Sequence, residues 1–458
     1  MLFPVNTQGD EAYPGSPWPL PQMWTKSTYL YVLDPKVFFI TTNAENCSII
    51  EEGLSRLSDV FNTVFKGIER ESNRSATVSR LPALQTIYLQ IDLIRDCDVV
   101  YPKQDDNEYY EIDVPYRSTN DGRIMSYTIW GAIRALETLS QLIYVSDQKE
   151  LVLNATRIID WPRFSFRGVM VDSSRHFLPK NVLLANIDAM AYNKFNVFHW
   201  HIVDDQSFPY VSHVFPNLSL KGAYNPKTHI YNDIEIQQII DYANVRGIRV
   251  LVEFDTPGHT QSWGKGQPGL LTPCYTDNKP NGLFGPIDPI NDSSYQFIKT
   301  LFTEVVNLFP DQYFHLGGDE VDFQCWASNP DIRKYMASRN ITTYEKVEQI
   351  YIQKVLDIVK ELNKSYIIWQ EVFDNGVDIK PDTLVHVWKG GWPQEMFNIT
   401  AKGFKTLLSS CWYLNYISYG TDWGQYYSCD PQNFGGTQKQ NDLVIGGEAC
   451  MWGKESFH

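Results

Sequence analysis

The chain has 458 residues, of which 43% are hydrophobic and 14% aromatic, enough to fill more than one large core. Its formal net charge is −15 at pH 7, and no basic stretch offsets the acidic residues, so we expect no nucleic-acid partner. The chain has no run of 18 apolar residues, so we expect no membrane-spanning helix.

Cysteines and glycosylation motifs point to an oxidising compartment. The chain has 7 cysteines, none of them in a C-x-x-C pair, and carries eight Asn-x-Ser/Thr sequons between Asn46 and Asn398. The first ten residues lack the basic and apolar stretches of a signal peptide. We therefore expect a protein of the secretory pathway, lysosomal or extracellular, whose N-terminus has been trimmed or wrongly assigned.

The N-terminal third alternates between helical and strand patterns. Residues 1–20 are rich in Pro and Gly and are expected to be extended. Within 21–160, apolar side chains recur at helical spacing over 54–65 and 133–143, and period-two alternation over 87–93 predicts a strand. These patterns predict a smaller α+β domain, and no cluster in it points to chemistry.

From residue 161 to 458, short apolar strands alternate with helical segments. The expected strands are 167–172, 195–201, 249–254, 313–316, 366–369, 384–388, 405–408 and 443–446. Helical faces lie over 234–243, with Asn232 as the cap and Gly247 as the stop, and over 297–309 and 347–362. Eight such repeats predict a (β/α)8 TIM barrel. Because the sequence stops soon after the eighth strand, we expect the final helix to be missing.

The stretch His315-Leu-Gly-Gly-Asp319-Glu320-Val321 is the most informative one. It reads as a strand that ends in a tight glycine turn with two adjacent carboxylates. Like charges held close raise one pKa, so one group can stay protonated while its neighbour is anionic. A proton donor beside an anion is what breaking an acetal requires. An isolated Asp-Glu pair would more often be two solvated loop acids, but the glycines and the other strand ends favour catalysis.

In barrels of this kind, chemistry lies at the C-terminal ends of the strands. The expected ends carry Asp172, Arg175, His199, Trp200, His201, Asp204, Asp205, Glu253, Asp255, His259, Asp319, Glu320, Trp369, Gln370, Glu371, Trp388, Trp412, Tyr413, Leu414, Asn415, Glu448 and Trp452. Aromatic faces with interspersed acids suit sugar rings. A divalent metal held by the two histidines of the second strand with Asp204 and His259 is the alternative. Four tryptophans would crowd its open coordination position, so we expect no metal and no other cofactor.

Five ordered motifs resemble glycoside hydrolase family 20, and more closely the animal lysosomal β-N-acetylhexosaminidases. They are residues 172–178, 198–205, 254–260, 315–321 and 446–453. The resemblance is strong from about residue 160 to 453. It implies exo-hydrolysis of terminal non-reducing β-linked N-acetylglucosamine or N-acetylgalactosamine, with retention and without a metal. In that family the acetamido oxygen of the substrate is the nucleophile and an oxazolinium ion is the intermediate.

The resemblance also implies roles for single residues. Glu320 would be the general acid and base, and Asp319 would accept the acetamido N–H. Tyr413 would hold the acetamido oxygen, while Asp204 and His259 would orient the glutamate. The remaining implied substrate-binding residues are Arg175 on the ring hydroxyls, the aromatic walls Trp369, Trp388 and Trp452, and Asn415.

The family pattern further implies the disulfides Cys47–Cys97 and Cys274–Cys325, a free Cys450, and a homodimer or heterodimer. Cys411 and Cys429 are additional to that pattern, and pairing between them is possible. Lys454 stands where the family has a hydroxyl-binding glutamate. The opposing hypothesis is therefore a truncated, inactive homologue that binds glycans or a partner subunit.

Overall fold

A computed structural model describes residues 14–34, 37–71, 81–92, 97, 100–117 and 120–453. Lys454 and most of the predicted extended segment, residues 1–13, lie outside this range. The described residues form two compact units. The first runs to residue 163 and includes 188–195 and 244–248, and the second contains the remainder.

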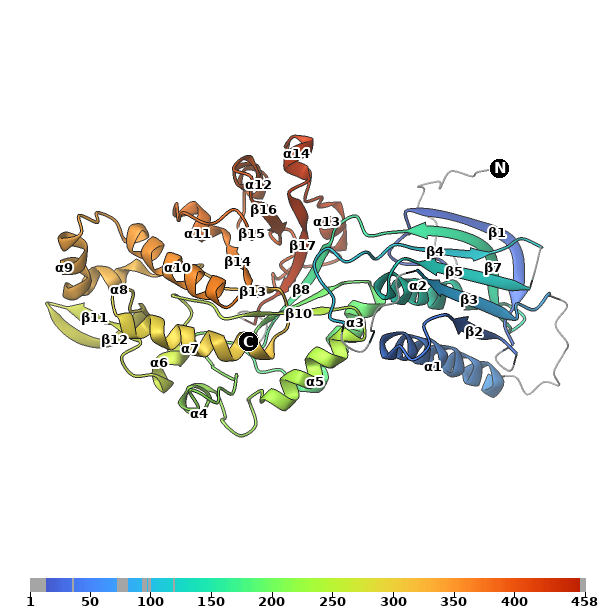
Figure 1. Cartoon of the computed structure of the whole chain (residues 1–458), viewed down its shortest axis with the longest axis horizontal. Helices are drawn as coiled ribbons and strands as arrows, with labels where there is room; N and C mark the ends of the chain where they lie inside the picture. Colours follow the sequence, from blue (N-terminus) through green and yellow to red (C-terminus); the bar gives the residue numbers. More distant parts are fainter. Residues whose placement is uncertain are drawn as a thin grey trace. The chain divides into compact units, whose positions relative to one another are not determined.

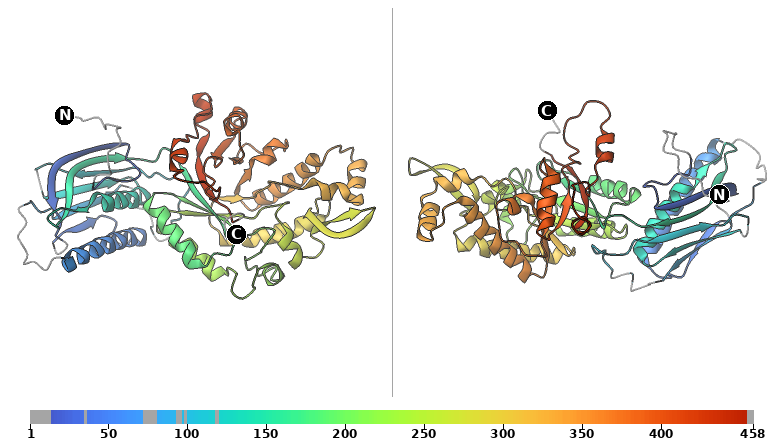
Figure 2. Two further views of the ribbon diagram at one scale, coloured as in Figure 1. Left: turned by 180° about the vertical axis from the view of Figure 1, so that it is seen from behind. Right: turned by 90° about the horizontal axis from the view of Figure 1, so that it is seen from above.

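The first unit is a mixed sheet with two helices on one face (Figure 2). Its strands are β1 (Met23–Val32), β2 (Phe39–Thr42), β3 (Thr86–Ile91), β4 (Tyr110–Val114), β5 (Asp121–Ser126), β6 (Tyr144–Val145) and β7 (Leu151–Asp160), in the order β1-β7-β4-β5-β3-β2 with β6 beside β7. The helices α1 (Ser48–Glu71) and α2 (Ile129–Leu142) contain the two helical patterns. Thr128 caps α2 by accepting from the Gly131 N–H. This arrangement confirms the α+β prediction.

The second unit contains a closed parallel barrel of eight strands, which confirms the predicted barrel (Figure 1). The barrel strands are β8 (Phe166–Asp172), β9 (Val197–His201), β10 (Arg249–Glu253), β13 (Tyr313–His315), β14 (Ser365–Trp369), β15 (Leu384–Val387), β16 (Lys405–Leu408) and β17 (Val444–Met451). The helices between them are α3 (Lys180–Tyr192), α4 (Asn217–Gly222), α5 (Asp233–Asn244), α6 (Gln261–Gly266), α7 (Asp292–Leu308), α8 (Phe323–Ser328), α9 (Pro330–Ser338), α10 (Tyr344–Glu361), α11 (Gln370–Asp374), α12 (Trp392–Ala401), α13 (Trp423–Ser428) and α14 (Gln438–Asn441).

Two details differ from the sequence-based expectations. Strand β17 runs five residues beyond the predicted end at 446 and pairs with β8 from Gly446 to Met451, which closes the ring. Ile234, assigned to the apolar face of α5, is 66% exposed, because the helix has only just begun there and the buried face starts at Ile236.

The interior of the barrel has an apolar layer and a polar layer. The apolar layer comes from the first residues of the strands and consists of Phe166, Val197, Leu251, Ile367, Leu384, Leu407 and Ile445. Nearer the C-terminal ends, the inward-facing side chains are polar or aromatic and equally buried: His199, His201, Glu253, His315, Trp369, His386 and Glu448. Alternation along each strand brings this second layer directly beneath the loops that carry the site.

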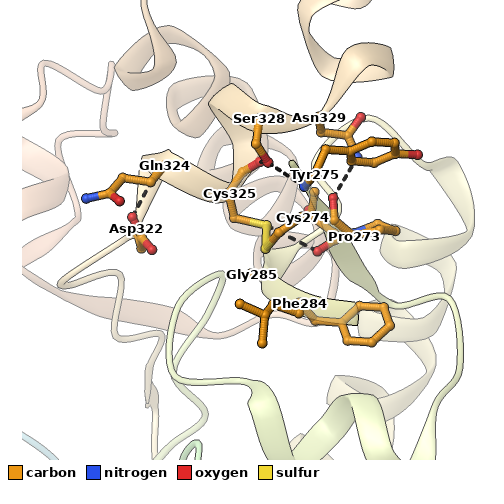
Figure 3. The surroundings of a disulfide bond; sticks show 12 residues. Pro273, Cys274, Tyr275, Phe284, Gly285, Asp322, Gln324, Cys325, Ser328 and Asn329 are labelled. Carbon is orange, nitrogen blue, oxygen red and sulfur yellow. Dashed lines mark hydrogen bonds between the residues drawn. A yellow bond between two sulfur atoms is a disulfide. The ribbon is translucent and has the colours of Figure 1, made fainter. Parts of the chain in front are cut away.

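Three disulfides hold loops in place. Cys274 in the hairpin β11 (Leu271–Thr276) and β12 (Lys279–Ile287) is bonded to Cys325 in α8, close to Ser328 and Asn329 (Figure 3). Cys47–Cys97 lies in the first unit, and Cys411 is bonded to Cys429. Cys450 is free and buried. The first two pairings are those expected from the family resemblance, and the third joins the two additional cysteines.

The pairing of β17 with β8, which closes the barrel and is here called the seam, predicts one large loss of stability on substitution. A Cβ atom added to Gly446 would lie 1.8 Å from the carbonyl oxygen of its partner Phe166. Gly446→Ala must therefore separate β17 from β8, and we expect it to lower the free energy of unfolding by about 3 kcal/mol or more. Gly424→Ala in α13 is the matched control, since no atom lies within 4 Å of its added Cβ. Equal denaturation midpoints for the two variants would contradict this account of the seam.

Candidate active site

A cavity of about 180 Å³ opens at the C-terminal ends of the barrel strands. It is lined by Arg175, Asp319, Glu320, Trp388, Tyr413, Asn415, Tyr416 and Trp452. These residues come from the loops after four strands and from the end of β17. Seven of the eight are residues that the sequence singled out for their position and type.

The glycine turn after β13 sets the direction of both carboxylates. Gly317 and Gly318 have φ values of +65° and +96°, which residues with a side chain rarely adopt. A Cβ on Gly317 would lie 1.8 Å from Asp255 Oδ1, so the turn needs a glycine to admit that carboxyl. Glu320 itself has φ +49°, an uncommon conformation for a residue of this type. The turn therefore directs Asp319 inward and Glu320 toward the mouth of the cavity.

Asp319 lies beside a second buried acid, Asp255, at the end of β10. Burial raises the pKa of both carboxyls, and for Asp255 the neighbouring Asp319 charge raises it further. Asp255 Oδ1 accepts from the Gly318 N–H at 2.8 Å. The two carboxyls share one proton. Asp255 carries it and donates it in a hydrogen bond to Asp319, which stabilises the carboxylate of Asp319. The other oxygen, Asp319 Oδ1, is buried and has no hydrogen-bond partner within the described residues.

His259 links the acids to a buried carboxylate. Its Nδ1 lies 3.2 Å from Asp204 Oδ1, and its Nε2 faces Glu320 at 3.6 Å and Asp319 at 3.7 Å. Burial acts to lower the pKa of His259, but Asp319 and Asp204 outweigh it and raise that pKa to about 9. The imidazolium therefore faces Glu320, whose side chain is 49% exposed.

Arg175 forms the polar wall of the cavity. Its guanidinium lies 3.0 Å from Asp172 and 2.9 Å from Asp204, and stacks over the Trp452 ring at 5.0 Å. Asp172 also accepts from the Gly453 N–H, so this carboxylate joins the first and last strand ends of the ring. These contacts fix the plane of the guanidinium between two carboxylates and one indole face.

Stacked aromatic rings form the other walls. Tyr413 lies parallel to Trp388 at 6.0 Å and to Tyr416 at 5.3 Å. Burial keeps the pKa of Tyr413 well above its usual value, so the phenol remains a hydrogen-bond donor. The Trp388 N–H donates to Glu371 Oε2 at 2.9 Å, which fixes the plane of that indole.

One predicted substrate contact lies elsewhere. Trp369 does not line the cavity: it is 1% exposed, and its N–H donates to Glu253 inside the barrel. Asp204 is also fully buried; its side chain contacts Arg175, His201 and His259 and accepts from the Asp205 N–H. Conversely, Asp255 and Glu371 had no role assigned from the sequence, although both follow strands as Asp319 and Glu320 do.

Three groups within the described residues bring ligand-type atoms within 4.8 Å of one another: His199–His315–His386, Asp204–Asp205–His259 and Asp255–His259–Asp319. The second group contains an acid that already binds the Arg175 guanidinium, and a cation there would be repelled. The third contains the shared proton described above. In the first group, the two ring nitrogens of His199 already face carboxylates, Glu448 at 2.8 Å and Glu253 at 3.1 Å. These donor sets therefore fit hydrogen-bonded networks better than a metal ion.

Comparisons with known proteins agree with this geometry. The family model described as glycosyl hydrolase family 20, catalytic domain, matches residues 164–457, and one described as beta-acetyl hexosaminidase like matches residues 17–142. The chain is 45% identical over 448 residues to the beta-hexosaminidase subunit alpha of Rattus norvegicus, covering 95% of this chain and 83% of that protein. It is 46% identical over 446 residues to the beta-hexosaminidase subunit beta of Homo sapiens, covering 95% and 78%.

Among solved structures, the chitobiase of Flavobacterium johnsoniae superposes with a TM-score of 0.81 at 30% identity, covering 95% of this chain and 65% of that one. The chain therefore belongs to glycosyl hydrolase family 20, together with the animal β-hexosaminidase subunits, and is a glycosidase. In the part of the chain that the structure describes, no helix is both long and apolar enough to cross a bilayer.

The buried charges predict that the protein loses stability as the pH rises above neutrality. The pKa values of His199, His201 and His259 are raised to about 9, 10 and 9, because neighbouring carboxylates outweigh the opposing effect of burial. Their stabilisation is complete below the unfolded value of 6.5 and is lost as pH rises toward 9–10. Burial raises the pKa of Glu371 to about 7 and of Glu348 to about 8, from 4.5, so ionising them also destabilises the fold.

Between pH 6.5 and 8, loss of the histidine protons and ionisation of the two glutamates both lower the free energy of unfolding. We expect the melting temperature to fall by about 3–6 °C from pH 6.5 to 8.5 at constant ionic strength. His315 and His386, whose pKa values are lowered by burial, oppose the trend only below pH 6.5. The measurement is calorimetry over this range, and a His201→Gln variant should show a shallower slope. A melting temperature that rises with pH would contradict the charge assignments.

Proposed function

We propose that this enzyme removes terminal non-reducing β-linked N-acetylhexosamine from glycoconjugates, by a retaining mechanism in which the substrate's acetamido group is the nucleophile. The observation that carries the proposal is the pairing of two differently placed carboxylates. Glu320 lies at the mouth of the cavity, while Asp319 presents an unpartnered oxygen within it. The names of the related hexosaminidases support the same reaction.

In the first step, Glu320 donates its proton to the glycosidic oxygen as the bond to the anomeric carbon breaks. General acid catalysis of this kind contributes about 10²–10⁴-fold. The carboxylate left on Glu320 faces the His259 imidazolium, which stabilises its charge. The same carboxylate then takes a proton from the water that attacks the intermediate.

The acetamido oxygen attacks the anomeric carbon and forms a cyclic oxazolinium ion. Because nucleophile and electrophile belong to one bound molecule, proximity contributes about 7–11 kcal/mol. Asp319 Oδ1 would accept the acetamido N–H, and its negative charge would offset the positive charge of the ring. Tyr413, still a phenol, would donate to the acetamido oxygen and hold it in line.

The remaining walls would bind the sugar. Trp388 and Trp452 offer flat faces to the ring and the acetamido methyl, and Arg175 and Asn415 offer polar atoms to the hydroxyl groups. Trp369 would support these walls from below. No step uses a metal ion or another cofactor. We further propose a lysosomal or extracellular location and a homodimer or heterodimer, as the related subunits suggest.

Separable roles for the two carboxylates are the first test of this mechanism. Glu320→Gln should lower kcat by about 10³-fold on an alkyl or sugar glycoside and far less on a dinitrophenyl glycoside, whose leaving group needs no proton. Asp319→Asn should lower turnover of both substrates alike, since acetamido participation serves both. If Glu320→Gln slowed both substrates equally, the assignment of the acid would be wrong. Absence of turnover in the unmodified chain would favour the alternative of a glycan-binding homologue.

The stereochemistry of the product is the second test. Two inversions at one carbon cancel, so the first-formed sugar should be the β-anomer by proton NMR. A stable thiazoline analogue of the oxazolinium ring should bind at least about 10²-fold more tightly than the substrate. An α-anomer as the first product would exclude the substrate-assisted route.

A further inference from the structure

A chain of alternating acidic and imidazole groups crosses the barrel interior beneath the cavity. In order, its members are Glu448, His199, Glu253, His201, Asp204 and His259, with successive separations of 2.8, 3.1, 2.7, 2.7 and 3.2 Å. The first five side chains are at most 1% exposed, and they come from β17, β9, β10 and the loop after β9. The chain ends at the mouth of the cavity, where His259 faces Glu320.

His201 is the central link of this chain. Its Nδ1 lies 2.7 Å from Glu253 Oε2, and its Nε2 lies 2.7 Å from Asp204 Oδ2. A carboxylate can only accept hydrogen bonds, so an imidazole between two carboxylates must carry a proton on both nitrogens. His201 is therefore an imidazolium without access to solvent.

Glu253 has few other partners that could replace His201. Its Oε1 accepts from the Trp369 N–H at 2.8 Å. His315 Nδ1 lies 3.2 Å away but already accepts from the Gly317 N–H, so it has no proton to donate there. The charge of Glu253 is thus balanced at Oε2, where His201 lies at 2.7 Å and His199 at 3.1 Å.

We propose that His201 and Glu253 are positioning residues for the acid–base step. They keep Asp204 ionised and fixed in direction, and through it they hold His259 protonated and turned toward Glu320. This inference rests on the proposed function of Glu320 as the general acid. It assigns the polar layer of the barrel a part in the reaction although none of its atoms lines the cavity.

The surrounding charges determine what each substitution does. His201 faces Glu253 and Asp204, and His259 faces Arg175, Asp204, Asp255, Asp319 and Glu320. His201→Gln removes a cation, so the general acid Glu320 should hold its proton to higher pH. Glu253→Gln removes an anion and should act in the opposite direction. Removing one charge within a few residue layers of Glu320 should move the alkaline limb by about 1 pH unit.

The test is the pH profile of kcat/KM for His201→Gln and Glu253→Gln, on an alkyl glycoside and on a dinitrophenyl glycoside. The alkaline limb should move to higher pH for His201→Gln and to lower pH for Glu253→Gln. Both variants should lose about 10-fold or more on the alkyl glycoside and less than about 3-fold on the dinitrophenyl glycoside. His386→Gln is the matched control, because it changes the same residue type at the same burial in the same layer, and its only ion-pair contact within the described residues is the 3.9 Å approach to Glu448, at the far end of the chain from Glu320. It should leave the limb in place.

The outcomes are separable. Equal losses on both substrates with unmoved limbs, in variants that still melt cooperatively, would overturn the inference and indicate a purely structural role. Displacement of both limbs in the same direction would overturn it as well.

Glu320→Gln is assayed in parallel: if it lacks leaving-group dependence, the proposed function itself fails. If Glu320→Gln has that dependence and the two barrel variants do not, only the inference fails. Glu253→Gln keeps the side-chain shape, so it remains informative should His201→Gln not fold.

Discussion

The structure of the site depends on keeping one carboxylate, Asp204, charged inside the barrel. A buried anion is unfavourable unless it is paired and hydrogen-bonded. Asp204 meets this condition with three cationic groups: Arg175, His201 and His259. Burial acts to raise its pKa, but the histidine hydrogen bonds outweigh this and hold that pKa well below its ordinary value. One fixed charge therefore orients both the Arg175 guanidinium in the cavity wall and the imidazolium beside Glu320.

A second constraint is the contrast between the two adjacent acids after β13. Adjacency in sequence would place equal charges side by side, but the left-handed turn sends them to different surroundings. Asp319 is buried against Asp255, while Glu320 is half-exposed beside His259. Each acid is therefore suited to one part of the reaction by its environment and not by its residue type. The backbone conformation of Gly317 and Gly318 is what makes this division possible.

Much of this architecture could be predicted from the sequence. Short apolar strands spaced by amphipathic helices identify a barrel, and polar residues at the strand ends identify its catalytic face. The glycine-flanked Asp319-Glu320 pair and Arg175 lie in the cavity for that reason. Trp369, which the family resemblance placed among the aromatic walls, is buried with its N–H on Glu253, and the sequence does not say whether a residue at a strand end points up into the cavity or across the barrel.

The role of the histidines could not be predicted either. His199 and His201 are buried inside the barrel, and the acids that pair with them come from strands far apart in the sequence. Only closure of the ring brings Glu448 next to His199. A pairing of this kind has no signature along the chain, whereas the cap of α5 at Asn232 is local and was found.

The Cys274–Cys325 bond joins the region after β10, which supplies His259, to the region after β13, which supplies Glu320. Gln261, two residues after His259, donates hydrogen bonds to Asp205 and to the hairpin carbonyls of Phe284 and Gly285, so the region after β10 is also tied to the loop after β9. Cross-links of this length reduce the freedom of the unfolded chain more than they add contacts to the folded one. Recombinant material made in a reducing cytosol should therefore mature slowly and incompletely at the catalytic loops, while an oxidising secretory host should yield uniformly competent enzyme.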